Sequence, residues 1–220
     1  MSAFNMRRRD VLMGGSAGII LGLTGFGSDQ NMGLGFGGKQ AHAADLEAAL
    51  APRTIGNPDA PIRMAEYFSL SCSHCANFHN GTFKQIKKEW IDTGKMLFEY
   101  RDFPLQGPAI YAHALARSVP VAAYDGMLDI LFKQQKKWTT APDPVTELAK
   151  IARIAGIGND AFVEIIQNRP LLEGIVAIAQ EGYSTYQINS TPIFVINKKT
   201  VIRGDRWYDA FLAELNKLAA

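Results

Sequence analysis

The chain has 220 residues, of which 47% are hydrophobic, and a formal net charge of +2. This composition fits one or two globular domains. The basic excess lies at Arg7, Arg8 and Arg9, and beyond position 43 the acidic and basic residues balance. The chain therefore lacks the clustered basic face that nucleic-acid binding requires, and we expect no nucleic-acid partner.

Residues 1–43 have the pattern of an export signal. Arg8-Arg9-Asp10 precedes an apolar, glycine-rich stretch from Val11 to about Phe26, which is too short for a comfortable membrane span. Ala41-His42-Ala43 has small residues where a signal peptidase needs them, so we predict cleavage after Ala43. The arginine pair suits twin-arginine export, with the general secretory route and an uncleaved membrane anchor as open alternatives.

A glycine-rich segment at 33–39 imitates a nucleotide-binding loop. It follows no predicted strand, and Gln40 stands where a phosphate loop needs Ser or Thr. We therefore expect a spacer at this position and no cofactor.

The first half of the predicted fold is a strand, a helix and a second strand. After the turn at Asn57–Pro61, the apolar run Ile62–Ser69 predicts a buried strand. Apolar residues at helical spacing then predict one helix that ends at Gly94. Met96–Tyr100 predicts the second strand.

The pattern from 105 to 188 is helical throughout, and a hairpin and a final helix follow it. The predicted helices are Ala109–Ala116, Tyr124–Gln135, one from Val145 to Ala155, one around Phe162–Ile166, and Leu171–Tyr186. Ile193–Asn197 and Thr200–Arg203 predict a hairpin joined by Lys198-Lys199. Asp205 is expected to cap the last helix, whose inner stripe comprises Trp207, Phe211, Leu215 and Leu218.

The two cysteines of the chain, Cys72 and Cys75, are separated by two residues. A bridge between them closes a very small loop and stabilises a fold poorly, so the pair favours chemistry over a structural role. The pair lies where a strand meets a helix, and the N-terminus of a helix lowers the pKa of a thiol. Ala76 excludes a c-type haem motif, and zinc lacks a second cysteine pair, so we predict no metal. Copper delivery stays open as an alternative, since thiolates suit soft metals.

Two segments resemble the DsbA family of thioredoxin-fold oxidases. They are Glu66-Tyr67-Phe68-Ser69-Leu70-Ser71-Cys72-Ser73-His74-Cys75 and Asn189-Ser190-Thr191-Pro192-Ile193-Phe194-Val195. The resemblance covers essentially the whole chain after the signal. It implies an α/β thioredoxin-like fold with an inserted all-helical domain.

The resemblance also implies roles for these residues. Cys72 would be the exposed nucleophile and Cys75 the buried resolving thiol, tuned by the dipeptide Ser73-His74. Thr191-Pro192 would face the cysteines through a cis bond and bind substrate. Independently, Glu66 lies in an apolar run that points to the core, where a lone carboxylate is costly, and we predict that it carries a proton for Cys75.

Two positions depart from the best-known members of that family. Ser73 replaces a proline, and Thr191 replaces the valine of the strongest oxidase, while isomerases of the wider group often have threonine there. Of the remaining histidines, His79 and His113 are expected to be surface or packing residues. The aromatic residues Phe68, Phe78, Trp90 and Trp207 are expected in the core.

These inferences predict five parts of the chain: a signal at 1–43, a lead-in at 44–60, a thioredoxin-like first half at 61–104, a helical insertion at 105–188 and a second half at 189–220. The predicted function is a monomeric periplasmic thiol:disulfide oxidoreductase that introduces disulfides into reduced exported client proteins. The resemblance implies reoxidation by a quinone-linked, DsbB-like membrane partner. The alternatives are a disulfide isomerase or reductase, and a non-catalytic copper or client chaperone.

Overall fold

A computed structural model describes residues 46–105 and 107–219. The predicted signal and its cleavage site lie outside this part of the chain. Within the described residues, no helix has the length and apolar character needed to span a membrane.

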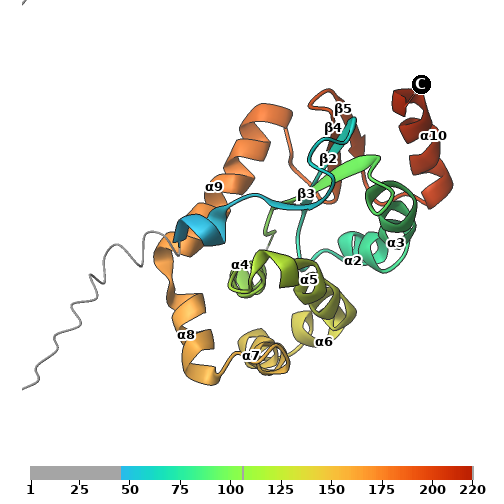
Figure 1. The fold of residues 1–220 in the computed structure, drawn as a ribbon. Helices are drawn as coiled ribbons and strands as arrows, with labels where there is room; N and C mark the ends of the chain where they lie inside the picture. The colour runs from blue at the N-terminus through green and yellow to red at the C-terminus, as the bar shows by residue number, and fades with distance from the viewer. Residues whose placement is uncertain (1–45, 106, 220) are drawn as a thin grey trace, which may run out of the picture. The chain divides into compact units, whose positions relative to one another are not determined.

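The described chain is built on a five-stranded sheet of order β1-β3-β2-β4-β5 (Figure 1). The strands are β1 Arg53–Gly56, β2 Ile62–Phe68, β3 Met96–Asp102, β4 Ile193–Ile196 and β5 Thr200–Arg203. Central β2 is parallel to β3 and antiparallel to β4, and β1 and β5 pair antiparallel at the two edges. The predicted strands are present, and β2 carries the cysteine pair at its carboxyl end.

Strand β1 lies in the segment that the sequence suggested was only a lead-in. Only Ile55 of its four residues is a large hydrophobe, so it lacks a readable alternation. The strand is held by its first residue instead. Arg53 is buried, and its Nη2 donates to the carbonyl oxygens of Ala49 and Arg117 at 3.2 and 2.9 Å.

The predicted helix after the cysteines is three consecutive pieces. They are α2 Ser73–Asn80, α3 Thr82–Ile86 and a π-helical turn at Lys87–Ile91. The break falls at Gly81, whose φ of −122° and ψ of −95° are not helical. Its backbone N–H nevertheless satisfies carbonyls at the end of α2, donating to Asn77 and Phe78.

The hairpin of β4 and β5 is present, but its turn is one residue earlier than expected. Asn197 and Lys198 both have left-handed φ values, of 48° and 59°, and Lys199 N donates to Ile196 O at 3.0 Å. Two successive left-handed residues make the type of turn whose twist matches that of the flanking strands. The turn therefore centres on Asn197-Lys198 instead of Lys198-Lys199.

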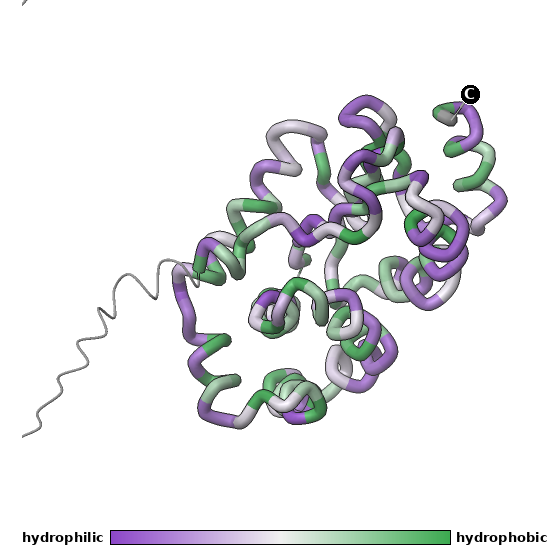
Figure 2. Tube along the Cα trace, in the orientation of Figure 1, coloured by the Kyte–Doolittle hydropathy of each residue, from purple (hydrophilic) through white to green (hydrophobic). Residues whose placement is uncertain are grey.

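Six α-helices lie between β3 and β4 and form the predicted helical insertion (Figure 1). Their bounds are α4 Gly107–Arg117, α5 Tyr124–Lys133, α6 Gln135–Thr139, α7 Pro144–Ile154, α8 Asn159–Gln167 and α9 Arg169–Tyr186. Hydrophobic and hydrophilic residues alternate along α7, α8 and α9 in Figure 2, as expected for helices with one buried face. Helix α5 contacts α2, and α9 contacts β3, so the insertion packs on both the cysteine-bearing helix and the sheet.

The final helix, α10 Tyr208–Ala219, differs from its prediction at its start. Phe211 and Leu215 are buried as expected, but Leu218 is exposed and Trp207 is 87% exposed. The backbone N–H groups of Ala210 and Phe211 donate to the carbonyl of Trp207, which places Trp207 at the helix start with its side chain outside the buried stripe. Asp205 does not cap the helix, because its carboxylate is bonded to His74.

Candidate active site

Cys72 and Cys75 occupy unequal positions at the start of α2. Cys72 is the N-cap residue, with φ −81° and ψ 121°, and is half-buried. Cys75 lies in the first turn and is fully buried, and both residues are thiols in this structure. Only Cys72 is therefore open to attack from outside the protein.

The surroundings of Cys72 favour its thiolate. A hydrogen bond from the thiol of Cys75 contributes most to lowering the pKa of Cys72 to about 5. Burial opposes this change, while the side chain of Thr191 and the backbone N–H groups of Cys75 and His74 support it. The two backbone donors are the unpaired groups that a helix N-terminus provides, as the sequence predicted.

Cys75 has the opposite character. Burial is the main cause that raises the pKa of its thiol well above 9, followed by Cys72 and by the negative charge of Glu66. A thiolate on Cys75 is therefore unfavourable at neutral pH and needs a proton as soon as it forms.

Thr191 and Pro192 lie against the reactive thiol. Their peptide bond is cis, as the resemblance implies. The Sγ of Cys72 donates to the carbonyl oxygen of Thr191 at 3.3 Å. The Oγ1 of Thr191 is buried and has no hydrogen-bond partner among the described residues, so this hydroxyl remains available as a donor to a thiolate on Cys72.

Ser73 and His74 are exposed at the start of α2. The Nδ1 of His74 lies 2.8 Å from Asp205 Oδ1, and its side chain is 64% exposed. The contribution of His74 to the lowered pKa of Cys72 comes from its backbone N–H. The imidazole instead ties the cysteine helix to the loop before α10.

Glu66 is fully buried, as its apolar surroundings in the sequence indicated. Its Oε2 lies 2.7 Å from His79 Nε2, and its Oε1 has no partner within the described part of the chain. Burial is the main cause that raises the pKa of Glu66, and the nearby His79 partly offsets it. Of the two positions expected for His79, surface or packing, the structure shows the packed one, and His79 is also a buried partner of Glu66.

His113 is also buried, in a polar network behind the active-site loop. The N–H of Leu70 donates to His113 Nε2 at 3.2 Å, so the ring proton must be on Nδ1, which lies 2.5 Å from Asp102 Oδ1. Arg117 pairs with the other oxygen of the same carboxylate. Because Leu70 is two residues before Cys72, this network fixes the backbone that leads to the nucleophile, and His113 is more than the surface or packing residue predicted.

Gln135 holds the same loop from the insertion. Its Nε2 donates to the carbonyl oxygens of Leu70 and Cys72, both at 2.8 Å. Sequence reasoning missed Gln135, because its partners are more than sixty residues away and no local pattern marks the contact.

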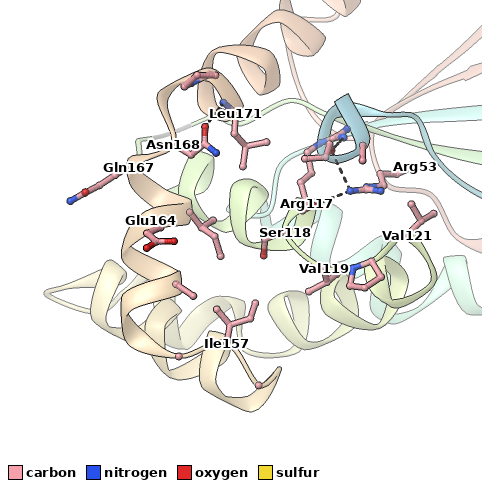
Figure 3. Close-up of a pocket in the computed structure, with 18 of the residues that line it drawn as sticks. Arg53, Arg117, Ser118, Val119, Val121, Ile157, Glu164, Gln167, Asn168 and Leu171 are labelled. Atoms are coloured by element: carbon pink, nitrogen blue, oxygen red, sulfur yellow. Dashed lines mark hydrogen bonds between the residues drawn. The ribbon is translucent and has the colours of Figure 1, made fainter. Parts of the chain in front are cut away.

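A separate cavity of about 1160 Å³ lies between the insertion and the segment that leads into β1, away from the cysteines (Figure 3). Its walls include Val119 and Ile157, and Arg53 and Arg117 lie at one side with the hydrogen bond between them drawn. Neither cysteine lines it. Within residues 46–105 and 107–219, no group of three or more His, Cys, Asp or Glu side chains is arranged to hold a metal ion.

The sheet, the helical insertion and the cysteine pair at the start of α2 define a thioredoxin-fold protein. A family model described as "Thioredoxin" matches residues 49–216, and the chain belongs to this family. The α/β thioredoxin-like fold with an inserted helical domain, predicted from the sequence, is confirmed.

Individual relatives agree with the predicted resemblance to DsbA. The crystal structure of Wolbachia pipientis alpha-DsbA1 is 31% identical with a TM-score of 0.70, and the match covers 76% of this chain and 90% of that one. A Rickettsia bellii protein, provisionally named a protein-disulfide oxidoreductase, is 28% identical over 144 residues, or 65% of this chain and 56% of its own length. Disulfide bond formation protein D of Bacillus subtilis is 28% identical over 104 residues, which is 44% of this chain and 46% of that protein.

The chain spans about half the length of the curated relatives that it matches. Their names, together with the DsbA structure, support the predicted enzyme class, a protein disulfide oxidoreductase.

Proposed function

We propose that this protein is a dithiol oxidase that transfers the Cys72–Cys75 disulfide to reduced client proteins. The observation that carries the proposal is the contrast between the two cysteines. Cys72 is accessible and its pKa is lowered to about 5, whereas Cys75 is buried and its pKa is raised. A low-pKa thiol is a good leaving group, so the enzyme releases Cys72 readily and favours its own reduced form.

The reaction begins when a client thiolate attacks Cys72 Sγ of the oxidised enzyme. A client–Cys72 disulfide forms, the Cys72–Cys75 bond breaks, and Cys75 leaves as a thiolate. Because Cys75 holds a negative charge poorly, it takes a proton, and Glu66 is the buried acid beside it. The second client thiolate then attacks the client sulfur, and Cys72 leaves as a thiolate that needs no proton.

Thr191 and Pro192 form the proposed contact for the client backbone. The carbonyl of Thr191 accepts the Cys72 thiol in the reduced protein. When Cys72 joins a client sulfur it has no hydrogen to donate, so this carbonyl becomes available to an extended client strand. Ser73 and His74, exposed beside Cys72, would contact the same client.

Trapping experiments test the assignment of the two cysteines. Cys75→Ser should accumulate mixed disulfides with clients, because the resolving thiol is lost. Cys72→Ser should form none, since the remaining thiol is buried. Equal trapping by the two variants would contradict the proposal.

The proposed compartment is the periplasm, where a DsbB-like quinone-linked membrane enzyme would reoxidise the pair. Arg8-Arg9 and Ala41-His42-Ala43 support export. Mass spectrometry of the exported protein should find Ala44 as its first residue, and an intact Met1 would contradict cleavage. Replacing Arg8 and Arg9 by lysine should strand the precursor if the twin-arginine route is used.

A disulfide isomerase or reductase is the second candidate, favoured by the threonine before Pro192. Alkylation of protein thiols in intact cells separates the two functions. A mostly oxidised Cys72–Cys75 pair supports the oxidase, and a mostly reduced pair supports the isomerase or reductase.

A further inference from the structure

The buried pair of Glu66 and His79 leaves one oxygen of the carboxylate bonded and the other free. One carboxylate oxygen, Oε2, is bonded to His79 Nε2 at 2.7 Å, while Oε1 is buried and has no partner within the described residues. The side chain of Glu66 is completely buried, whereas 6% of the His79 side chain is exposed. Of the two groups, His79 is therefore the one that can exchange protons with solvent.

Aromatic rings hold the imidazole in place. His79 stacks on Phe132 of α5, with ring centroids 4.4 Å apart and an interplanar angle of 18°. Phe83 of α3 and Phe78 of α2 pack against other parts of the ring at 4.9 and 5.5 Å. A ring held on several sides keeps Nε2 directed at Glu66, and this fixes which carboxylate oxygen remains free.

We propose that His79 is a positioning residue for the proton step of disulfide exchange: it holds Oε2 of Glu66, leaves Oε1 for Cys75, and passes a proton to Glu66 during each transfer. The inference rests on the proposed function. When Cys75 leaves as a thiolate, the proton on Oε1 of Glu66 moves to the Cys75 sulfur and gives a neutral thiol. In the same step the Nε2 proton of His79 moves to Oε2 of Glu66, so no buried carboxylate charge is left, and His79 regains a proton from water. Reoxidation of the enzyme runs the same steps in reverse.

The other ionisable groups near the pair are few. Cys72 and Cys75 face Glu66 from α2, and Tyr100 of β3 stacks on His79 at 6.0 Å. Tyr100 itself donates to Asp125 of α5 at 2.5 Å, and the pKa of its hydroxyl is raised well above 10, chiefly by burial. Tyr100 therefore stays protonated over the working pH range and takes no part in the proton step.

The test is the pH dependence of a single turnover. Oxidised enzyme in excess is mixed with a reduced peptide that contains two cysteines, and the rate of peptide oxidation is measured from about pH 5 to pH 9, on either side of the ordinary histidine pKa. The ratio of variant to wild-type rate cancels the ionisation of the peptide. A purely structural loss lowers this ratio by the same factor at every pH, whereas loss of a proton carrier makes the ratio depend on pH.

For His79→Gln we expect a ratio that falls as the pH rises, with a loss of about tenfold at the alkaline end. This is less than the roughly hundredfold that a directly acting acid contributes, because His79 acts through Glu66. Glutamine can still donate to Oε2 but does not titrate, so it separates the hydrogen bond from the proton transfer. The double variant Glu66→Gln/His79→Gln should be no slower than Glu66→Gln alone, because the two residues act on one proton. The matched control is Phe132→Leu, which removes the stacking partner and keeps the imidazole, and its ratio should not change with pH.

Thermal melting of each variant checks that it is folded. A ratio for His79→Gln that does not vary with pH, or additive losses in the double variant, would overturn the inference while the oxidase assignment stands. A wild-type protein that cannot oxidise the peptide would overturn the proposed function and this inference together. His74→Gln identifies any pH dependence that comes from the exposed imidazole beside Cys72.

Discussion

The side-chain amide of Gln135 donates to the carbonyl oxygen of Cys72 at 2.8 Å. It joins the first residue of α6 to the residue that begins the cysteine helix, and the same nitrogen also reaches Leu70 O. The helical insertion thus holds the backbone of the nucleophile directly.

Replacing Gln135 should loosen this attachment. Gln135→Leu puts an apolar side chain of similar size in the site and leaves two carbonyl groups without their donor, which should lower the free energy of unfolding by about 1–3 kcal/mol. The measurement is urea denaturation of the reduced protein. Gln134→Leu is the matched control, because Gln134 is only half-buried and its side chain makes no hydrogen bond to the described residues. Equal losses in the two variants would mean that the contact to Cys72 O is of no consequence.

The reduced protein should be more stable than the oxidised one at neutral pH. Cys72 has a folded pKa of about 5 against an ordinary value near 9, so its ionisation stabilises the folded reduced form. The gain is complete above the unfolded pKa, amounts to about 2–3 kcal/mol at pH 7, and is lost as the pH falls through 5. The disulfide of the oxidised form closes a very small loop, so it stabilises the fold only slightly and does not offset the gain from the Cys72 thiolate.

Urea denaturation of both redox forms from pH 4 to pH 8 checks this expectation. The stability difference should shrink towards pH 5 (about the folded pKa of Cys72). Cys72→Ser, which cannot form the disulfide, should lack the gain in stability that the reduced wild-type protein shows above pH 5. An oxidised form that is the more stable at pH 7 would favour the reductase or isomerase alternative.

Acid should weaken the network behind the loop through Asp102. Although burial alone would raise it, Arg117 and His113 together hold the pKa of this buried carboxyl at about 2. A lowered carboxyl pKa stabilises the fold above the unfolded value near 4, and this contribution of about 2–3 kcal/mol is lost as the pH falls towards 2.

Asp102→Asn should cost about 3–5 kcal/mol at pH 7, because it leaves Arg117 buried without a counter-charge. It should also flatten the acid limb of a stability profile measured by urea denaturation between pH 2 and pH 5. Asp59→Asn, at an exposed position, should change neither quantity. An unchanged acid limb in Asp102→Asn would show that other carboxyl groups govern acid unfolding.

Trp207 should contribute little to stability, in contrast to its predicted place in the core. Trp207→Ser is expected to change the free energy of unfolding by less than about 0.5 kcal/mol, since the side chain is 87% exposed. Trp138→Ala should cost about 3–5 kcal/mol, because that indole is buried and donates to Leu131 O at 3.1 Å. A large loss for Trp207→Ser would mean that the side chain packs against the protein in solution.

The sequence predicts well those elements whose hydrophobic pattern lies in one run of consecutive residues. The strand that ends before Cys72, the hairpin of β4 and β5 and the helical insertion all have local periodicity, and the structure contains them. Strand β1 escaped prediction because a four-residue edge strand is too short to show periodicity, and what holds it is a buried arginine.

The active site divides in the same way. The sequence near each residue is enough to predict that Cys72 is accessible, that Cys75 lies deeper and that Glu66 is buried. It is not enough to predict the partner of Glu66, because His79 faces outward or inward depending on where α2 packs, and the helix gives no other indication. Gln135 and His113 act on Leu70 from distances of 65 and 43 positions along the chain, and such contacts leave no trace in a single sequence.

Strand β2 acquires its two neighbours at very different moments of synthesis. Its partner β3 follows within about thirty residues, but β4 comes after the whole insertion, and contacts at that end, such as Arg63 N to Asn197 Oδ1, span 134 positions. Closing so long a loop is slow, because its entropic cost precedes any stabilising contact. Until the last thirty or so residues emerge, Thr191 and Pro192 cannot cover Cys72. A nascent chain therefore carries an unshielded pair of thiols while all the residues between Cys75 and Thr191 are made, and it is the hairpin of β4 and β5 that converts this pair into a controlled site.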